Sequence, residues 1–85
     1  MTAIAKKQMI EYILQDVIRR PQTEIDENTA LVSSGLIDSL ALVDILVKLE
    51  DLTNLRIPAG KVNAQNMDTI ESMFSTALRV GKPRH

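Results

Sequence analysis

The sequence has no cysteine, and its single histidine, His85, stands at its end. The lack of cysteine excludes a disulfide scaffold, a thiolate metal site and a cysteine nucleophile. His85 is a poor candidate for a metal ligand or a catalytic base, so a serine nucleophile would lack its base. Glycine-rich phosphate loops and the H-E-x-x-H and G-x-S-x-G motifs are also missing. We therefore expect neither an enzyme nor a metal site.

Long apolar runs are missing as well. No stretch approaches the roughly 20 consecutive apolar residues of a membrane-spanning helix. Lys6 and Lys7 are not followed by the apolar stretch and cleavage site that a signal peptide requires. The sequence thus predicts a cytoplasmic protein that makes no membrane contact.

Aromatic residues, glycine and proline are scarce, whereas 45% of the 85 residues are hydrophobic. A chain of this length forms one domain, and its composition supports a single modest core. Because Tyr12 and Phe74 are the only aromatic residues, that core must consist mainly of leucine, isoleucine, valine and methionine. We expect one domain over residues 1–85, acting as a monomer.

Apolar residues recur at helical spacing in three segments. The first and last stripes are Ile10, Ile13, Leu14, Val17 and Ile18, and Ile70, Met73, Phe74, Ala77 and Leu78. Pro21 ends the first helix, and Gly81 with Pro83 ends the last. With a short helix opened by Pro58, the pattern predicts an all-α bundle of three long helices and one short one. The expected helices are about 3–19, 39–53, 58–64 and 68–80, followed by a frayed tail over 81–85.

Polar residues are expected to cap the helices and to shape one long loop. Thr2 would cap the first helix and Asp38 the second, and Asp68 with Glu71 has capping-box spacing. Residues 20–37 form a connection of a length that is uncommon in compact domains unless it is pinned or functional. The expected pins are Ile25, Leu31 and Val32.

The helix at 39–53 has two distinct faces. The stripe expected to face the core consists of Leu42, Ile45, Leu46 and Leu49. Truncation of Leu46 to alanine should therefore cost about 2–4 kcal/mol. The opposite side carries Leu40, Asp44, Val47 and Asp51. Single exposed apolar residues are ordinary on protein surfaces, but two of them flanked by acids favour a contact surface.

Charge is segregated along the chain, with nine acidic and three basic side chains between residues 21 and 78. A partner with a basic surface is the natural complement; the alternative is that these charges only solvate the surface. The helix at 39–53 carries Asp44, Glu50 and Asp51 against Lys48 alone, so it would repel phosphates. We expect no binding of nucleic acid.

The tripeptide Asp38-Ser39-Leu40 stands where the long loop meets this helix. Taken alone, such a tripeptide indicates only the start of a helix. A phosphodiester on Ser39, however, would meet the positive end of the helix dipole and free backbone N–H groups. The position therefore suits a phosphate-linked group that other proteins handle.

These residues resemble the acyl carrier protein family, which includes acyl, aminoacyl, peptidyl and D-alanyl carriers. The similar stretches are Gly35-Leu36-Ile37-Asp38-Ser39-Leu40, Val43 to Glu50, Ile57-Pro58 and Met67 to Glu71. The resemblance implies an acyl-carrier-type bundle in which Ser39 receives 4′-phosphopantetheine from coenzyme A through a phosphopantetheinyl transferase. The thiol of the arm would hold the cargo as a thioester, and Asp38 would cap the helix and support the metal or the transferase during attachment.

The resemblance also implies a set of partners and a partner surface. A loading ligase and downstream transferases with basic docking surfaces would contact Leu40, Asp44, Val47 and Asp51. The sequence departs from fatty-acid carriers at Ala41, Leu42, Lys48 and Thr53, and its segment 59–66 is longer. These departures suggest a dedicated carrier for an amino acid, a modified lipid or a specialised metabolite. A carrier for housekeeping fatty-acid synthesis and an unmodified helical interaction module are the alternatives left open.

Overall fold

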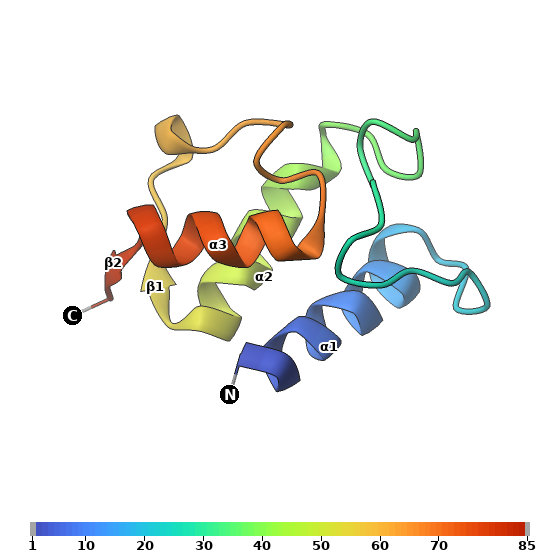
Figure 1. Ribbon diagram of the computed structural model, residues 1–85, viewed down its shortest axis with the longest axis horizontal. Coiled ribbons are helices and arrows are strands. Elements are labelled where there is room, and N and C mark those ends of the chain that lie inside the picture. The colour runs from blue at the N-terminus through green and yellow to red at the C-terminus, as the bar shows by residue number, and fades with distance from the viewer. Residues whose placement is uncertain (1, 85) are drawn as a thin grey trace.

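The computed structural model describes residues 2–84, without the side chain of Thr2. Its body consists of three helices that each contact the other two (Figure 1): α1 (Thr2–Tyr12), α2 (Ala41–Thr53) and α3 (Ile70–Val80). Two short strands pair in antiparallel fashion: β1 (Leu55–Arg56) and β2 (Lys82–Pro83). The cap expected from the Thr2 side chain, and His85, lie outside the described residues. Within the described part, no helix is long and apolar enough to cross a membrane.

The core is mainly aliphatic, as the composition requires. All three helices and both long connections contribute to it: Met9, Ile13, Leu31, Ile37, Ile45, Leu49, Ile57, Met67, Ile70, Met73, Phe74 and Ala77. Of the three residues expected to pin the long loop, Leu31 is fully buried, whereas Ile25 and Val32 are partly buried against the core. The core therefore fixes the middle of the loop as well as the helices.

The first helical segment continues beyond α1 as a π-helical turn, η1 (Ile13–Val17). The N–H of Ile18 donates to the carbonyl of Ile13 at 2.7 Å, which is the five-residue hydrogen bond of a π-helix. Arg19 then adopts a left-handed conformation with a φ of 62°, and Pro21 cannot continue a helix. The segment thus ends close to the predicted residue 19, with a wider last turn than a regular α-helix has.

The short helix expected at 58–64 is reduced to a single 3₁₀ turn, η2 (Ala59–Lys61). Beyond it, the N–H of Asn63 donates to Oδ1 of Asn66 at 2.8 Å, and the N–H of Asn66 donates to Oδ1 of Asn63 at 2.9 Å. Such side-chain bonds offer the backbone an alternative to helical hydrogen bonds. The structure therefore does not confirm the fourth helix.

The tail expected to fray after Gly81 instead folds back along β1. Leu55 pairs with Pro83 and Arg56 with Lys82. A Cβ on Gly81 would collide with the carbonyl oxygen of Ala77 and lie 3.0 Å from Cδ1 of Leu55, so this tight return requires glycine. Sequence periodicity missed the pairing because two-residue strands from distant segments leave no alternating pattern.

The burial pattern of α2 corrects the expected cost of truncating Leu46. Ile45 and Leu49 are fully buried, whereas Leu42 and Leu46 are only partly buried beside the core. We expect Ile45→Ala to lower the free energy of unfolding by about 2–5 kcal/mol, and Leu46→Ala by only about 1–2 kcal/mol. Urea unfolding of both variants tests this order, and an equal or larger loss for Leu46→Ala would contradict it.

Candidate functional site

The long loop before α2 is fastened to the start of α3 by Asp68. The N–H of Leu31 donates to the main-chain oxygen of Asp68 at 2.8 Å. The N–H groups of Val32 and Ser33 donate to Oδ1 of Asp68 at 2.7 and 2.9 Å, and the Ser33 hydroxyl donates to Oδ2 at 2.7 Å. These donors, above all those of Ser33, lower the pKa of Asp68 below its usual value.

The expectation that Asp68 caps the last helix is therefore wrong. The cap of α3 is Thr69, whose hydroxyl oxygen accepts a hydrogen bond from the N–H of Ser72 at 3.0 Å. Asp68 lies two residues before α3, where its carboxylate can reach the loop. Its bonds to the loop bridge about 35 positions of the chain, and a local capping pattern does not report such a contact.

A second fastening joins the loop to α1 and α3. The N–H of Glu71 donates to the carbonyl oxygen of Glu27 at 2.9 Å, and Lys6 forms ion pairs with both carboxylates. The hydrogen bond between Lys6 and Glu71 raises the pKa of Lys6 and lowers that of Glu71. The loop is thus held at two points, Glu27 and residues 31–33, before it turns toward α2.

These contacts fix the path of the loop and so place Ser39 next to the start of α2. Gly35 turns the chain with a φ of 83°, and the buried Ile37 donates its N–H to the carbonyl of Leu31 at 3.0 Å. The carboxylate of Asp38 accepts a hydrogen bond at 3.0 Å from the N–H of Ala41, the first residue of α2. Ser39 follows as an exposed residue of the turn that leads into α2, because α2 begins at Ala41 and not at residue 39 as predicted.

The surroundings of Ser39 fit a covalently attached group. Asp38, Ser39 and Leu40 are all exposed, and Leu40 is 81% accessible. Within residues 2–84, no hydrogen bond engages the hydroxyl of Ser39. A group joined to that oxygen would therefore displace no packed side chain, and it would stand at the positive end of the α2 dipole.

The outward face of α2, meaning its exposed residues Leu40, Val43, Asp44, Val47 and Asp51, leads away from Ser39. Helical periodicity predicted four of these residues as exposed but missed Val43, which is 66% accessible. Val43 stands three residues after Leu40 and four before Val47. This spacing puts it on the same side of the helix as both, so its exposure could have been predicted. The face therefore has a continuous apolar ridge beside its two acids.

A shallow groove of about 210 Å³ lies beside this face and is lined by Tyr12, Asp44, Val47, Lys48 and Asp51. The ammonium of Lys48 lies 5.4 Å from the centre of the Tyr12 ring, a distance typical of a cation–π contact. Burial, and then the negative charges of Asp44 and Asp16, raise the pKa of Tyr12. The groove is thus acidic and partly aromatic.

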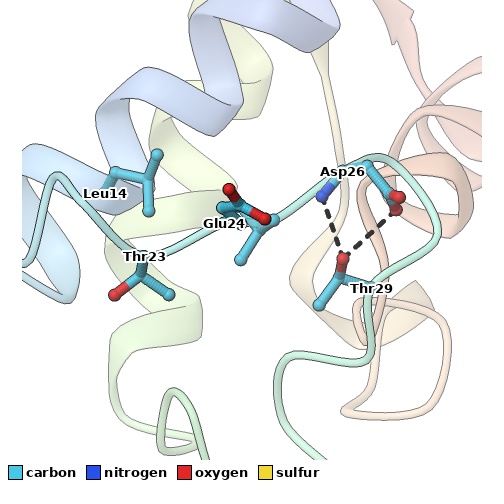
Figure 2. A pocket seen from close by; sticks show the side chains of 6 residues that line it. Leu14, Thr23, Glu24, Asp26 and Thr29 are labelled. Carbon is cyan, nitrogen blue, oxygen red and sulfur yellow. Dashed lines mark hydrogen bonds between the residues drawn. The ribbon is translucent and has the colours of Figure 1, made fainter.

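Two further pockets flank the body of the protein. An apolar pocket of about 190 Å³ lies between α2 and the following connection, and its lining includes Val43, Leu46, Val62 and Met67. A more polar pocket faces the long loop (Figure 2), where Thr29 accepts the N–H of Asp26 at 2.9 Å and donates to Oδ1 of the same residue at 3.2 Å. No cluster of metal-ligating residues occurs among the described residues.

The fold and the site define a small, mostly helical carrier-type domain with an exposed serine at the start of an amphipathic helix. The family model described as phosphopantetheine attachment site matches residues 10–77, and the chain belongs to this family. Comparison with curated proteins and with solved structures gives no match. Domains of this family carry 4′-phosphopantetheine, are not themselves catalysts, and work with a phosphopantetheinyl transferase and separate enzymes.

Proposed function

We propose that this protein carries acyl or aminoacyl cargo on a 4′-phosphopantetheine arm attached to Ser39, in a dedicated biosynthetic pathway. The observation that carries the proposal is the exposed Ser39 within Asp38-Ser39-Leu40 at the start of α2, inside the region that matches the family. The arm supplies a terminal thiol for a thioester, and the chain, which has no cysteine, has no thiol of its own.

The neighbours of Ser39 support attachment in two ways. Asp38 holds the turn that leads into α2 through its bond to the N–H of Ala41, so the backbone on either side of Ser39 is restrained while its side chain stays accessible. The positive end of the helix favours the negative charge of a phosphodiester at this position. We further propose that the exposed Asp38 carboxylate supports the metal or the transferase during attachment.

The outward face of α2 supports a dedicated pathway. Its acids are only Asp44 and Asp51, because Glu50 turns inward and accepts the N–H of Ile57 at 2.7 Å. A partner of this face needs an apolar centre and few cations, whereas a densely acidic helix would favour a strongly basic partner. The face therefore favours partners other than those of a highly acidic fatty-acid carrier.

One observation favours housekeeping fatty-acid synthesis as a second candidate function. The pocket beside Val43 and Met67 is apolar and suits a hydrocarbon segment. The mass of the thioester on protein purified from its native host separates the two. A straight-chain acyl group would support housekeeping synthesis, and an aminoacyl or otherwise modified group would support the dedicated pathway.

The absence of cysteine allows a direct test of the carrier function. Incubation with coenzyme A and a broad-specificity phosphopantetheinyl transferase, followed by gel filtration, should give one thiol per chain with a thiol-specific reagent. The same mixture without transferase should give none. A wild-type chain that gains no thiol under conditions that modify a known carrier would overturn the proposal in favour of an unmodified interaction module.

We expect Asp44→Lys to slow arm transfer roughly three- to tenfold without unfolding the protein, because a cation at this exposed position would repel the basic partner that the Asp44 carboxylate attracts. Transfer kinetics and circular dichroism measure the two effects. Glu11→Lys is the matched control, since Glu11 lies on α1 two residues from the buried Met9 and Ile13 and therefore on the opposite side of that helix. Equal rates for Asp44→Lys and wild type would show that Asp44 is not part of the partner surface.

A further inference from the structure

We propose that Arg84 occupies, within the same chain, the place of a partner's cationic side chain at Asp51, so that docking on α2 requires Arg84 to leave. This inference rests on the proposed carrier function and concerns how the outward face of α2 is reached. Nη2 of Arg84 lies 2.9 Å from Oδ1 of Asp51. Asp51 is one of the two acids on that face, so the contact neutralises half of the negative charge of the face.

The position of Arg84 is fixed by the fold of the segment before it. Gly81 allows the chain to turn back closely against Leu55, and β2 then pairs with β1. This return carries Arg84 from the end of α3 to Asp51 in the last turn of α2. The contact therefore depends on three features that act together: the glycine, the strand pair and the guanidinium.

The two acids of the face differ in their charge partners. Asp44 forms no ion pair within residues 2–84, while Asp51 holds Arg84. Lys48, four residues after Asp44 and thus within reach of it along the helix, lies over the Tyr12 ring instead. In the groove between α1 and α2, the charge of Asp51 is consequently neutralised by Arg84, whereas the charge of Asp44 is not neutralised by an ion pair among the described residues.

This distribution specifies the chemistry of the partner. Asp44 and Asp51 are seven residues apart, which along a helix is about 10 Å. A protein surface that fits the face presents an apolar centre over Val47, with two cations about 10 Å apart. One cation meets a free carboxylate at Asp44, and the other must displace Arg84. An arginine suits the second position best, because its guanidinium can reproduce the bond that Arg84 gives up.

The ion pair is partly exposed, with 36% of the Arg84 side chain and 59% of the Asp51 side chain accessible. Exposed pairs of this kind are weak, so competition should change the rate by about two- to fivefold rather than act as a complete block. The contact tunes docking and lowers nonselective binding of basic proteins. Its effect should decrease as salt concentration rises.

The test uses the rate of arm transfer to the full-length protein by a broad-specificity phosphopantetheinyl transferase at low salt. Arg84→Ala should raise kcat/KM about two- to fivefold through a lower KM. Lys82→Ala is the matched control, because it removes a cation from the same segment but none from Asp51, and it should leave the rate nearly unchanged. In an Asp51→Asn background, Arg84→Ala should have no further effect.

The outcomes separate this inference from the carrier function. An Arg84→Ala protein modified at the wild-type rate or more slowly would overturn the inference and leave the carrier function intact. A gain of the same size in Lys82→Ala would also overturn it, because general charge rather than the pair with Asp51 would then be responsible. A chain that accepts no arm in any variant would overturn the carrier function itself.

Discussion

Ser39→Ala is expected to abolish modification completely while leaving the fold intact. The Ser39 oxygen is the proposed acceptor of the arm, and alanine has no atom to replace it. Ser39 is exposed and contributes to none of the core, so the free energy of unfolding should change by less than about 0.5 kcal/mol. The measurements are intact mass after incubation with coenzyme A and transferase, and urea unfolding of the same protein.

Ser34→Ala is the matched control for Ser39→Ala. Ser34 lies five residues earlier and is also exposed, but its hydroxyl donates to the carbonyl of Ala30 at 2.6 Å within the loop. This variant should accept one arm as the wild type does. An arm on Ser39→Ala, or a loss of modification in Ser34→Ala alone, would contradict the assignment of Ser39.

Asp68→Ala is expected to lower the free energy of unfolding by about 2–4 kcal/mol. The carboxylate accepts hydrogen bonds from Val32 and Ser33 and from the Ser33 hydroxyl, and charged hydrogen bonds of this kind are among the stronger ones. Asp26→Ala is the control, because among residues 2–84 the Asp26 carboxylate bonds within its own turn, to Asn28 and Thr29. Urea unfolding that gives equal losses for both variants would contradict a structural role for Asp68.

The same carboxylate predicts a dependence of stability on pH. Its pKa in the folded protein lies below the usual 3.8, so the unfolded chain binds the proton more tightly and acid favours unfolding. The stabilisation is present above about pH 4 and is lost as the pH falls through the lower pKa of the folded state. The stability difference between wild type and Asp68→Asn should therefore shrink in acid, and a difference that grows toward low pH would contradict this assignment.

Sequence periodicity predicted the parts of the structure that depend on local spacing. The buried pair Ile45 and Leu49 and the exposed pair Leu40 and Val47 follow from the 3.6-residue turn of a helix. Val43 could also have been predicted from the same spacing, because it continues the ridge between the exposed pair. The role of this face as a partner surface stays a proposal.

Contacts between distant segments could not be predicted in this way. Aspartate is a favoured capping residue and Asp68 lies two residues before α3, yet its carboxylate bonds to a loop about 35 residues earlier. Arg84 meets Asp51 only because Gly81 and a strand pair turn the chain back. Such pairings depend on how the helices pack. They leave no periodic pattern in the sequence from which they could be predicted.

The most direct measurement is fragmentation mass spectrometry of the wild-type protein after incubation with coenzyme A and a phosphopantetheinyl transferase. The chain has five serines: Ser33, Ser34, Ser39, Ser72 and Ser75. We expect the mass of one phosphopantetheine arm only on fragment ions that contain Ser39. An arm on another serine, or none on a chain that remains folded, would contradict Ser39 as the attachment site.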